Sequence, residues 1–363
     1  MIRKLFHFIF VLLILGLIIG IPGGWMLYRS YNDPEVHYFQ AKEGEGEESL
    51  RFVVISDLFD YVFEGGNGVI ADLAGDTSPD AILIGGNMIT SDLQDLTPLT
   101  DLIKRLTQIA PVYYSYGEQE LDYVKAHSGQ DGTADSLREA LEKSGAVVLN
   151  ESYADVTLYG INTRIGGMFN NAYEMTNLRQ EVKKRYESTW KFLNDYQASD
   201  SLKIMLSSRP ESFVYSDACD TWDIDLVISG NNLGGLVVVP YYGGLLGRSG
   251  EYFPEYIHGM YGKGEVNLFI TSGLSAPKGG VGGIPRLNNP PEIAVLDIIG
   301  LKMGAQHTPE QQEAPVQETA ADENAAVQGE AAPEEENAGD DSSEESEEEA
   351  AEEETAEESG EEE

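Results

Sequence analysis

Residues 51–59, RFVVISDLF, begin with a short apolar run rich in β-branched side chains and end in a polar loop. Residues 81–90, AILIGGNMIT, repeat this pattern. Runs of this length and composition predict buried strands, with a loop following the carboxyl end of each strand. Similar runs predict further strands at residues 112–116, 156–161, 203–206, 225–228, 266–271 and 292–298.

Helical patterns lie between several of these strands. Apolar residues at three- and four-residue spacing predict helices at residues 93–110, 134–143 and 174–196. Strands that alternate with helices indicate an α/β fold in which most central strands are parallel. Ligands of such folds bind at the loops beyond the carboxyl ends of the strands. The strand-end loops are therefore the expected place for a functional site.

Five strand-end loops carry glycine and polar residues in a recognisable order: Asp57-Leu58-Phe59, Gly85–Thr90, Gly117–Glu120, Ser207–Glu211 and Ser229–Gly235. Their order resembles that of the calcineurin-like metallophosphoesterases, specifically the membrane-anchored bacterial branch. The loops of that family read D-x-H, G-D-x-x-D, G-N-H-D/E, an isolated H and G-H-x-H-G-G. The stretches FPEYIHGMY (253–261) and NPPEIAVLDI (289–298) strengthen the match. The resemblance implies a four-layer αββα sandwich with two central mixed sheets.

The same resemblance implies that most metal ligands of the family are replaced. The first Asp of the family matches Asp57, and the His beside it matches Phe59. The Asp that bridges the two metals matches Asn87, and the Asn of the G-N-H loop matches Glu118. The His that contacts the scissile phosphate matches Gln119.

The last two loops differ from the family pattern in the same way. The isolated His matches Ser208, and the two His of G-H-x-H match Asn231 and Leu233. Of the seven positions that bind metal in the family, only Asp57 is identical. The five histidines of the chain all lie outside these loops, at His7, His37, His127, His258 and His307.

These replacements argue against the family's two-metal chemistry. Two divalent cations about 4 Å apart repel each other and need a bridging anion, which the neutral Asn87 cannot supply. Phe59 and Leu233 offer no lone pair. Without bound metals no water of low pKa is generated, and without an imidazole at Gln119 the leaving oxygen lacks a proton donor. No cofactor is therefore expected, and no catalytic residue is intact.

Oxygen-bearing residues leave one weaker alternative open. Asp57, Asn87, Glu118, Asn231 and Glu120 could together bind a single Ca²⁺ or Mg²⁺, which prefer oxygen ligands. The simpler interpretation is that these groups hydrogen-bond the loops closed.

The amino terminus predicts a membrane anchor. Arg3 and Lys4 precede an apolar run at residues 5–27, which is long enough to cross a bilayer. The positive-inside rule places residues 1–30 as a single-pass signal anchor in the cell membrane, with the folded domain extracytoplasmic. A cleaved signal peptide is the alternative. We expect a linker at residues 31–49 and the phosphoesterase-like domain at residues 50–300.

The carboxyl terminus, residues 301–363, is acidic and poor in large apolar residues. From Thr308 onward it contains 24 of the 63 acidic residues and no Lys or Arg. Such a segment cannot bury enough apolar surface to fold, so it is predicted to be disordered. A cation or a cell-envelope protein is a possible partner for it. The net charge of −40 and the lack of a basic patch exclude nucleic-acid binding.

Three functions remain open from the sequence. The first is a pseudoenzyme that binds or scaffolds at the cell envelope. The second is a hydrolase that uses a reduced set of oxygen ligands around one metal. The third is an interaction protein that acts through its acidic tail. The single cysteine, Cys219, excludes a disulfide framework and a cysteine-based metal site.

Overall fold

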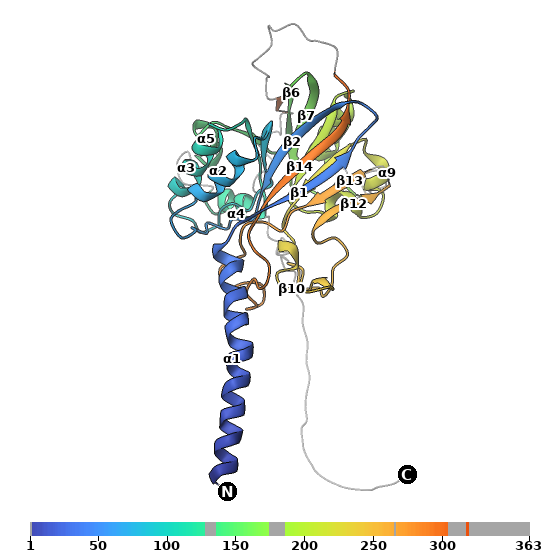
Figure 1. The fold of residues 1–363 in the computed structure, drawn as a ribbon. Coiled ribbons are helices and arrows are strands. Elements are labelled where there is room, and N and C mark those ends of the chain that lie inside the picture. Colours follow the sequence, from blue (N-terminus) through green and yellow to red (C-terminus); the bar gives the residue numbers. More distant parts are fainter. Residues whose placement is uncertain (1, 128–135, 174–185, 265, 304–316, 319–363) are drawn as a thin grey trace, which may run out of the picture. The chain divides into compact units, whose positions relative to one another are not determined.

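The computed structural model describes residues 2–127, 136–173, 186–264, 266–303 and 317–318. Two mixed sheets lie against each other in the centre of the domain, and helices cover their outer faces (Figure 1). The predicted α/β fold with two central mixed sheets is confirmed.

The first sheet contains six strands in the order β1-β14-β2-β3-β4-β5. All neighbouring strands are parallel except β14 and β2, which are antiparallel. The carboxyl ends of β2, β3 and β4 therefore lie at the same edge of the sheet. The strands are β1 (Glu35–Lys42), β14 (Glu292–Leu301), β2 (Glu48–Ile55), β3 (Ala81–Ile84), β4 (Val112–Ser115) and β5 (Ala146–Leu149).

The second sheet contains seven strands in the order β12-β13-β9-β8-β7-β6-β15. Its central neighbours, from β13 to β7, are parallel, and its outer neighbours are antiparallel. A separate small sheet pairs β10 (Val238–Val239) with β11 (Gly243–Gly244). The strands of the second sheet are β12 (Gly259–Lys263), β13 (Val266–Ile270), β9 (Leu226–Ser229), β8 (Leu202–Ser207), β7 (Ile161–Met168), β6 (Ser152–Leu158) and β15 (Gln317–Glu318).

The helix expected at residues 93–110 is present but shorter, as α3. The helices expected at 134–143 and 174–196 correspond to α5 and α7, and their residues 134–135 and 174–185 lie outside the described residues. The helices are α1 (Ile2–Asn32), α2 (Gly68–Asp76), α3 (Thr97–Leu106), α4 (Glu118–His127), α5 (Ser136–Lys143), α7 (Glu187–Gln197), α8 (Glu211–Val214), α9 (Ala218–Thr221) and the 3₁₀ turn η2 (Leu233–Gly235).

Three apolar layers hold these elements together, and they define the four-layer order. Helices α2, α3 and α5 pack on the outer face of the first sheet. The inner faces of the two sheets pack on each other, for example through Phe52 and Phe269. Helices α7, α8 and α9 pack on the outer face of the second sheet, where Cys219 is buried. Burial on both faces explains why the central strands are almost entirely apolar.

The predicted linker at residues 31–49 is wrong. Residues 35–42 form β1, which pairs in parallel with β14 along its full length, and β2 already begins at Glu48. Because β1 is an edge strand and is only partly buried, its sequence EVHYFQAK lacks the apolar run that marked the central strands. The domain therefore begins almost immediately after α1.

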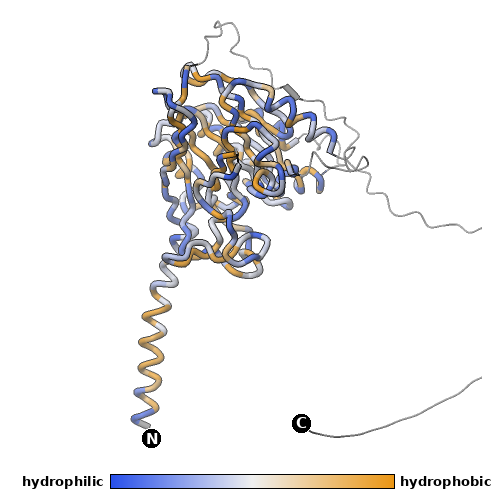
Figure 2. The backbone as a smooth tube through the Cα atoms, turned by 90° about the vertical axis from the view of Figure 1, so that its right-hand side faces the viewer, coloured by the Kyte–Doolittle hydropathy of each residue, from blue (hydrophilic) through white to orange (hydrophobic). Residues whose placement is uncertain are grey.

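Helix α1 is continuous and apolar (Figure 2). It is long enough and apolar enough to cross a membrane by length and composition. Its last turn contacts the domain, because Tyr31 accepts a hydrogen bond from the Arg286 backbone at 3.0 Å and Ser30 accepts one from Asn289 at 3.1 Å.

Most of the acidic tail lies outside the described residues. The exceptions in residues 301–363 are 301–303 and 317–318. Leu301 ends β14, and Gln317–Glu318 pair antiparallel with β6, so the prediction of a disordered tail does not hold for these residues.

Candidate functional site

The carboxyl ends of four strands bring together Asp57, Asn87, Ser208 and Asn231. These residues follow β2, β3, β8 and β9, as the loop pattern predicted. The Asn87 Nδ2 atom donates a hydrogen bond to Asp57 Oδ1 at 2.9 Å. It also lies 3.3 Å from Asn231 Oδ1 and 3.4 Å from Ser208 Oγ. We call these four residues the strand-end cluster.

The amide of Asn87 takes the place that the resemblance assigns to a bridging carboxylate. Its NH₂ group is a donor, so it supplies hydrogen bonds to the surrounding oxygens that a cation would otherwise bind. The second carboxylate oxygen, Asp57 Oδ2, accepts hydrogen bonds from Ser56 Oγ at 2.6 Å and from the Asn231 backbone at 2.9 Å. Asp57 is fully buried and both its oxygens are used. These residues do not fit a two-metal centre.

Apolar side chains occupy two further ligand positions, Phe59 and Leu233. Arg248 lies over the Phe59 ring, with its guanidinium carbon 5.2 Å from the ring centre. The Phe59 backbone donates a hydrogen bond to the Asn87 carbonyl at 3.0 Å, which places the ring next to the strand-end cluster. We call the buried apolar cluster at this place the apolar plug; it consists of Phe59, Leu233, Leu236, Leu246 and Ala276.

The predicted ligand Glu118 is not part of the strand-end cluster. It lies at the start of α4, is exposed, and forms an ion pair with Arg248 at 2.8 Å. The Gln119 side chain accepts a hydrogen bond from the Ser91 backbone at 3.3 Å. Its own backbone N–H donates to Asn87 Oδ1 at 3.2 Å. In the third loop, the Gln119 backbone N–H therefore positions the Asn87 side chain, and neither Glu118 nor Gln119 contributes a side chain to the strand-end cluster.

Glu120 is the residue that holds the second and third loops together. Its buried carboxylate accepts hydrogen bonds at 2.8 Å from the backbone N–H groups of Asn87, Met88 and Gly117, and one at 2.7 Å from Tyr114. Burial raises the pKa of Glu120, while these hydrogen bonds lower it. A sequence pattern cannot show that one carboxylate serves three backbone donors, so this role was missed.

The backbone is left-handed at five of the seven positions that the resemblance matches to metal ligands, and bulky L-residues rarely adopt this conformation. Strained residues of this kind cluster at functional sites and cost on the order of 1–3 kcal/mol each. The loops therefore have a demanding geometry. The φ angles are 56° at Asp57, 49° at Phe59, 55° at Asn87, 67° at Asn231 and 51° at Leu233.

Gly230 shows how closely the loops approach one another. A Cβ atom at this position would lie 2.3 Å from Asp57 Oδ2 and 2.4 Å from Ser56 Oγ. Only glycine permits this approach.

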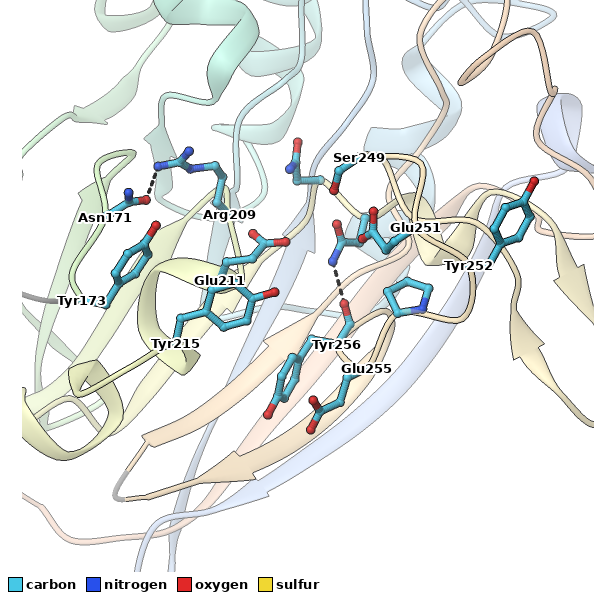
Figure 3. Close-up of a pocket in the computed structure, with 13 residues that line it drawn as sticks. Asn171, Tyr173, Arg209, Glu211, Tyr215, Ser249, Glu251, Tyr252, Glu255 and Tyr256 are labelled. Atoms are coloured by element: carbon cyan, nitrogen blue, oxygen red, sulfur yellow. Dashed lines mark hydrogen bonds between the residues drawn. The ribbon is translucent and has the colours of Figure 1, made fainter.

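A pocket of about 800 Å³ opens beside Asn231 (Figure 3). Its lining combines three carboxylates, from Glu211, Glu251 and Glu255, with one arginine, Arg209. Among the described residues, Glu251 Oε2 and Arg209 Nε are buried without a hydrogen-bond partner. The aromatic part of the lining is supplied by Tyr173, Tyr215, Tyr252 and Tyr256.

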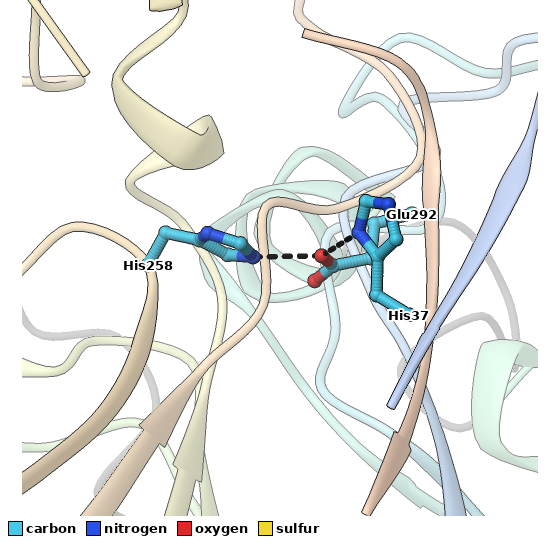
Figure 4. A group of neighbouring side chains, drawn as sticks. All are labelled: His37, His258 and Glu292. Atoms are coloured by element: carbon cyan, nitrogen blue, oxygen red, sulfur yellow. Dashed lines mark hydrogen bonds and ion pairs between the residues drawn. The ribbon is translucent and has the colours of Figure 1, made fainter. Parts of the chain in front are cut away.

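A second cluster joins His37, His258 and Glu292, which are far apart in the sequence (Figure 4). The Glu292 Oε2 atom lies 2.8 Å from His37 Nδ1 and 2.7 Å from His258 Nε2. The ligand atoms of the three residues all lie within 4.8 Å of one another. We call these residues the His–Glu cluster. Both histidines lie outside the five strand-end loops, so the loop pattern did not indicate them.

The hydrogen bonds within the His–Glu cluster shift the pKa values of its residues. Burial would raise the pKa of Glu292, but the hydrogen bonds from His258 and His37 outweigh burial and hold this pKa below its usual value. The hydrogen bond to Glu292 raises the pKa of His37. The fully buried Arg286 also interacts with Glu292 and Asp57, and burial lowers the pKa of its guanidinium to about 10.

Two mixed sheets covered by helices, with polar loops at the strand ends, form the αββα sandwich that the resemblance implied. No family model matches the sequence. The chain is 24% identical over 285 residues to an uncharacterized metallophosphoesterase of Campylobacter jejuni, covering 77% of this chain and 68% of that protein. The chain is therefore similar in sequence to a calcineurin-like metallophosphoesterase, in agreement with the resemblance of its five loops.

Solved structures that align with part of this chain include two hydrolases. A sulfate thiohydrolase of Thermus thermophilus aligns with a TM-score of 0.35 and 10% identity, covering 67% of this chain and 52% of that enzyme. This chain therefore spans about half of that enzyme's length. A phosphopantetheinyl hydrolase of Mycobacterium tuberculosis aligns with a TM-score of 0.36 and 12% identity, covering 63% of this chain and 89% of that protein.

Proposed function

We propose that this chain is a membrane-anchored member of the family that has lost phosphoester hydrolysis and acts by binding a ligand or partner at the cell envelope. The observation that carries the proposal is the amide of Asn87. It donates its hydrogen bond to Asp57 at 2.9 Å, where the family pattern calls for a second carboxylate and two cations. The apolar plug supports the proposal, because Phe59 and Leu233 leave no donor atoms for a metal.

The lining of the pocket beside Asn231 disfavours phosphate and favours an uncharged, hydroxylated ligand. Three carboxylates and one arginine give it a negative balance, which repels phosphate groups. Tyrosine rings and carboxylates suit hydroxylated ligands, because rings pack on the apolar faces of a sugar and carboxylates accept its hydroxyl hydrogens. We therefore favour a carbohydrate of the cell envelope as the ligand of this pocket.

Hydrolysis by the full chain in detergent micelles tests the loss of activity. Bis-p-nitrophenyl phosphate is the substrate, with Mn²⁺, Mg²⁺ or Ca²⁺ added in turn. We expect no hydrolysis above that of the Asp57→Asn variant, because Asp57 is the one ligand position that the family pattern and this chain share. Metal-dependent hydrolysis that disappears in Asp57→Asn would overturn the proposal and favour the reduced oxygen-ligand hydrolase.

Binding to cell-envelope oligosaccharides tests the pocket. We expect Glu251→Gln to weaken binding of the oligosaccharide that the unmodified chain retains, since Glu251 has a buried oxygen to offer. Glu64→Gln is the matched control, because Glu64 is an exposed glutamate that does not line the pocket. Equal binding by both variants would remove the pocket from the proposal.

The orientation and the tail complete the proposal. We infer that α1 crosses the membrane once and that the domain lies outside the cytoplasm, since Arg3 and Lys4 precede the apolar run. Protease added outside intact cells should then cleave the domain, and protection of the domain would reverse the orientation. Deletion of residues 308–363 should remove any partner that binds through the acidic tail, while a partner retained after the deletion binds elsewhere.

A further inference from the structure

We propose that His37, His258 and Glu292 bind one Zn²⁺ ion, which joins the edge strands of the two sheets and keeps one coordination position open to solvent. The site shares no residue with the strand-end cluster. Its metal would therefore be structurally separate from the two-metal centre of the family.

The donor set fits zinc. Two imidazole nitrogens and one carboxylate oxygen are the protein ligands of many zinc sites that keep a fourth position for water. Tetrahedral zinc with bonds of about 2.0–2.2 Å spaces its ligand atoms roughly 3.3 Å apart. The two histidine nitrogens now lie 2.8 and 2.7 Å from Glu292 Oε2, and all three ligand atoms lie within 4.8 Å of one another, so zinc binding requires the nitrogen–oxygen separations to grow by about half an ångström. Imidazole ligands favour Zn²⁺ over Mg²⁺ or Ca²⁺.

The outer shell of the site is already formed. His37 Nε2 faces Glu35 Oε2 at 3.4 Å, which is the carboxylate–histidine arrangement that orients metal-binding imidazoles. When His37 Nδ1 binds zinc, its proton is carried by Nε2 and faces Glu35. The second oxygen of Glu292 accepts hydrogen bonds from Thr271 Oγ1 at 2.7 Å and from the Ser272 backbone at 3.0 Å. The carboxylate is thus held in place without using the oxygen that faces the histidines.

Solvent can reach the site from the histidine side. The side chains of His37 and His258 are 42% and 35% exposed, whereas that of Glu292 is fully buried. A cation can therefore enter and retain a water molecule as its fourth ligand. The same arrangement distinguishes the cluster from the strand-end cluster, where Asp57 is buried and both of its oxygens are occupied.

The position of the site indicates what the metal would do. His37 lies on β1, the edge strand of the first sheet, and His258 directly precedes β12, the edge strand of the second. Glu35 also forms an ion pair with Arg29 of α1. Bound zinc would fasten the strand that follows the anchor helix to both sheets. We therefore expect zinc to stabilise the domain where it meets α1.

Zinc titration of the full chain in detergent micelles tests the site. After chelator treatment we expect one Zn²⁺ per chain to bind in a manner that depends on the cluster, with an upward shift of the melting temperature. His37→Ala and His258→Ala should each weaken this binding by more than about 100-fold, which exceeds the roughly 10–100-fold loss expected from an outer-shell change. Glu35→Gln should weaken it by about 10-fold.

Controls separate this site from other sources of binding. His127→Ala removes a histidine outside the cluster and should bind Zn²⁺ normally. Asp57→Asn should also bind Zn²⁺ normally. If metal binding instead depends on Asp57, the metal is bound at the strand-end cluster. That result would contradict the proposed loss of the family site and would not support a zinc site at the His–Glu cluster. The acidic tail is unchanged in every variant. As a check against local unfolding of His258→Ala, His258→Gln and the absorption bands of bound Co²⁺ provide a second readout. Zinc binding by the His37→Ala/His258→Ala double variant equal to that of the unmodified chain would overturn the proposal.

Discussion

The strand-end cluster and the His–Glu cluster each contain one buried carboxylate, but the groups around that carboxylate differ. At the strand-end cluster, the loops that the resemblance matches to the family's metal-binding loops have a left-handed backbone at several positions, and an amide and the apolar plug occupy the space between them. In the His–Glu cluster no family motif is present, yet two imidazoles and a buried carboxylate converge with solvent on one side. The loop pattern alone therefore does not locate the groups that can bind a metal; the side chains that converge on one another do.

Arg286 connects the two regions. Its buried guanidinium donates to the carbonyl oxygens of Ser272, Gly273 and Ser275, and its charge acts on both Asp57 and Glu292. A fixed buried cation of this kind offsets the carboxylates without any metal. At Asp57 the Asn87 amide completes that compensation. At Glu292 the two exposed imidazoles remain free to exchange a hydrogen bond for a metal bond.

The largest effect is expected from Glu120→Ala. The substitution leaves three buried backbone donors and the Tyr114 hydroxyl without their acceptor, which should lower the free energy of unfolding by on the order of 4 kcal/mol. Urea unfolding of the full chain in micelles measures the change. Glu118→Ala, two residues away and exposed, should change it by about 0.5 kcal/mol or less. Similar losses from both variants would mean that Glu120 does not hold the loops.

Phe59→Ala should have the next largest effect, because it opens a cavity in the apolar plug. Loss of a buried phenylalanine side chain lowers the free energy of unfolding by about 3 kcal/mol. Phe253→Ala, at an exposed phenylalanine, is the matched control and should lie within about 0.5 kcal/mol of the unmodified chain. A small loss at Phe59 would show that the plug is loosely packed and that the former metal cavity is still open.

Asn87→Asp tests the strand-end cluster most directly, because it places a second carboxylate against Asp57. Asn87 Nδ2 lies 2.9 Å from Asp57 Oδ1, so two charged oxygens would meet there. We expect unfolding at neutral pH to become easier by about 2 kcal/mol, and saturating Mn²⁺ to recover most of this loss. Thermal melting with and without Mn²⁺ measures both effects.

The double variant Asp57→Asn/Asn87→Asp is the control for this experiment. It keeps one carboxylate and one amide but exchanges their positions, so it should respond to Mn²⁺ no more than the unmodified chain. If Asn87→Asp is equally insensitive to Mn²⁺, the strand-end loops have lost the metal geometry as well as the ligands.

The sequence predicted most of the strands that are buried on both faces and the loops that follow them, but it placed one strand at residues 156–161, where the structure has the end of β6, a turn and the start of β7. Runs such as RFVVIS and AILI are apolar over their full length, and the glycines beside them mark the close approaches at Gly230 and Gly117. The resemblance of five loops then identified Asp57, Asn87, Ser208 and Asn231 as neighbours. The sequence could not predict β1, because an edge strand alternates polar and partly buried residues. The His–Glu cluster was missed for the same reason, since His37 lies on β1 and meets residues more than 200 positions away.

Glu43→Gln should have the smallest effect on stability. It tests how β1 is held at the end opposite His37. Burial and the nearby Asp225 carboxylate raise the pKa of Glu43 from 4.5 to about 7, while a hydrogen bond from Asn267 at 3.2 Å opposes the shift. The pKa of Glu43 is higher in the folded state than in the unfolded state, so the uncharged carboxyl group stabilises the fold. The stability that this group contributes is fully present below pH 4.5 and is lost as the pH rises through about 7. Glu43→Gln should therefore raise the free energy of unfolding near pH 8 by about 1 kcal/mol, after allowance for partial exposure, and leave it unchanged near pH 4.5. Glu45→Gln, at an exposed glutamate two residues away, is the control and should show no such pH dependence. If Glu43→Gln stabilises the fold equally at both pH values, a buried charge at Glu43 does not strain β1.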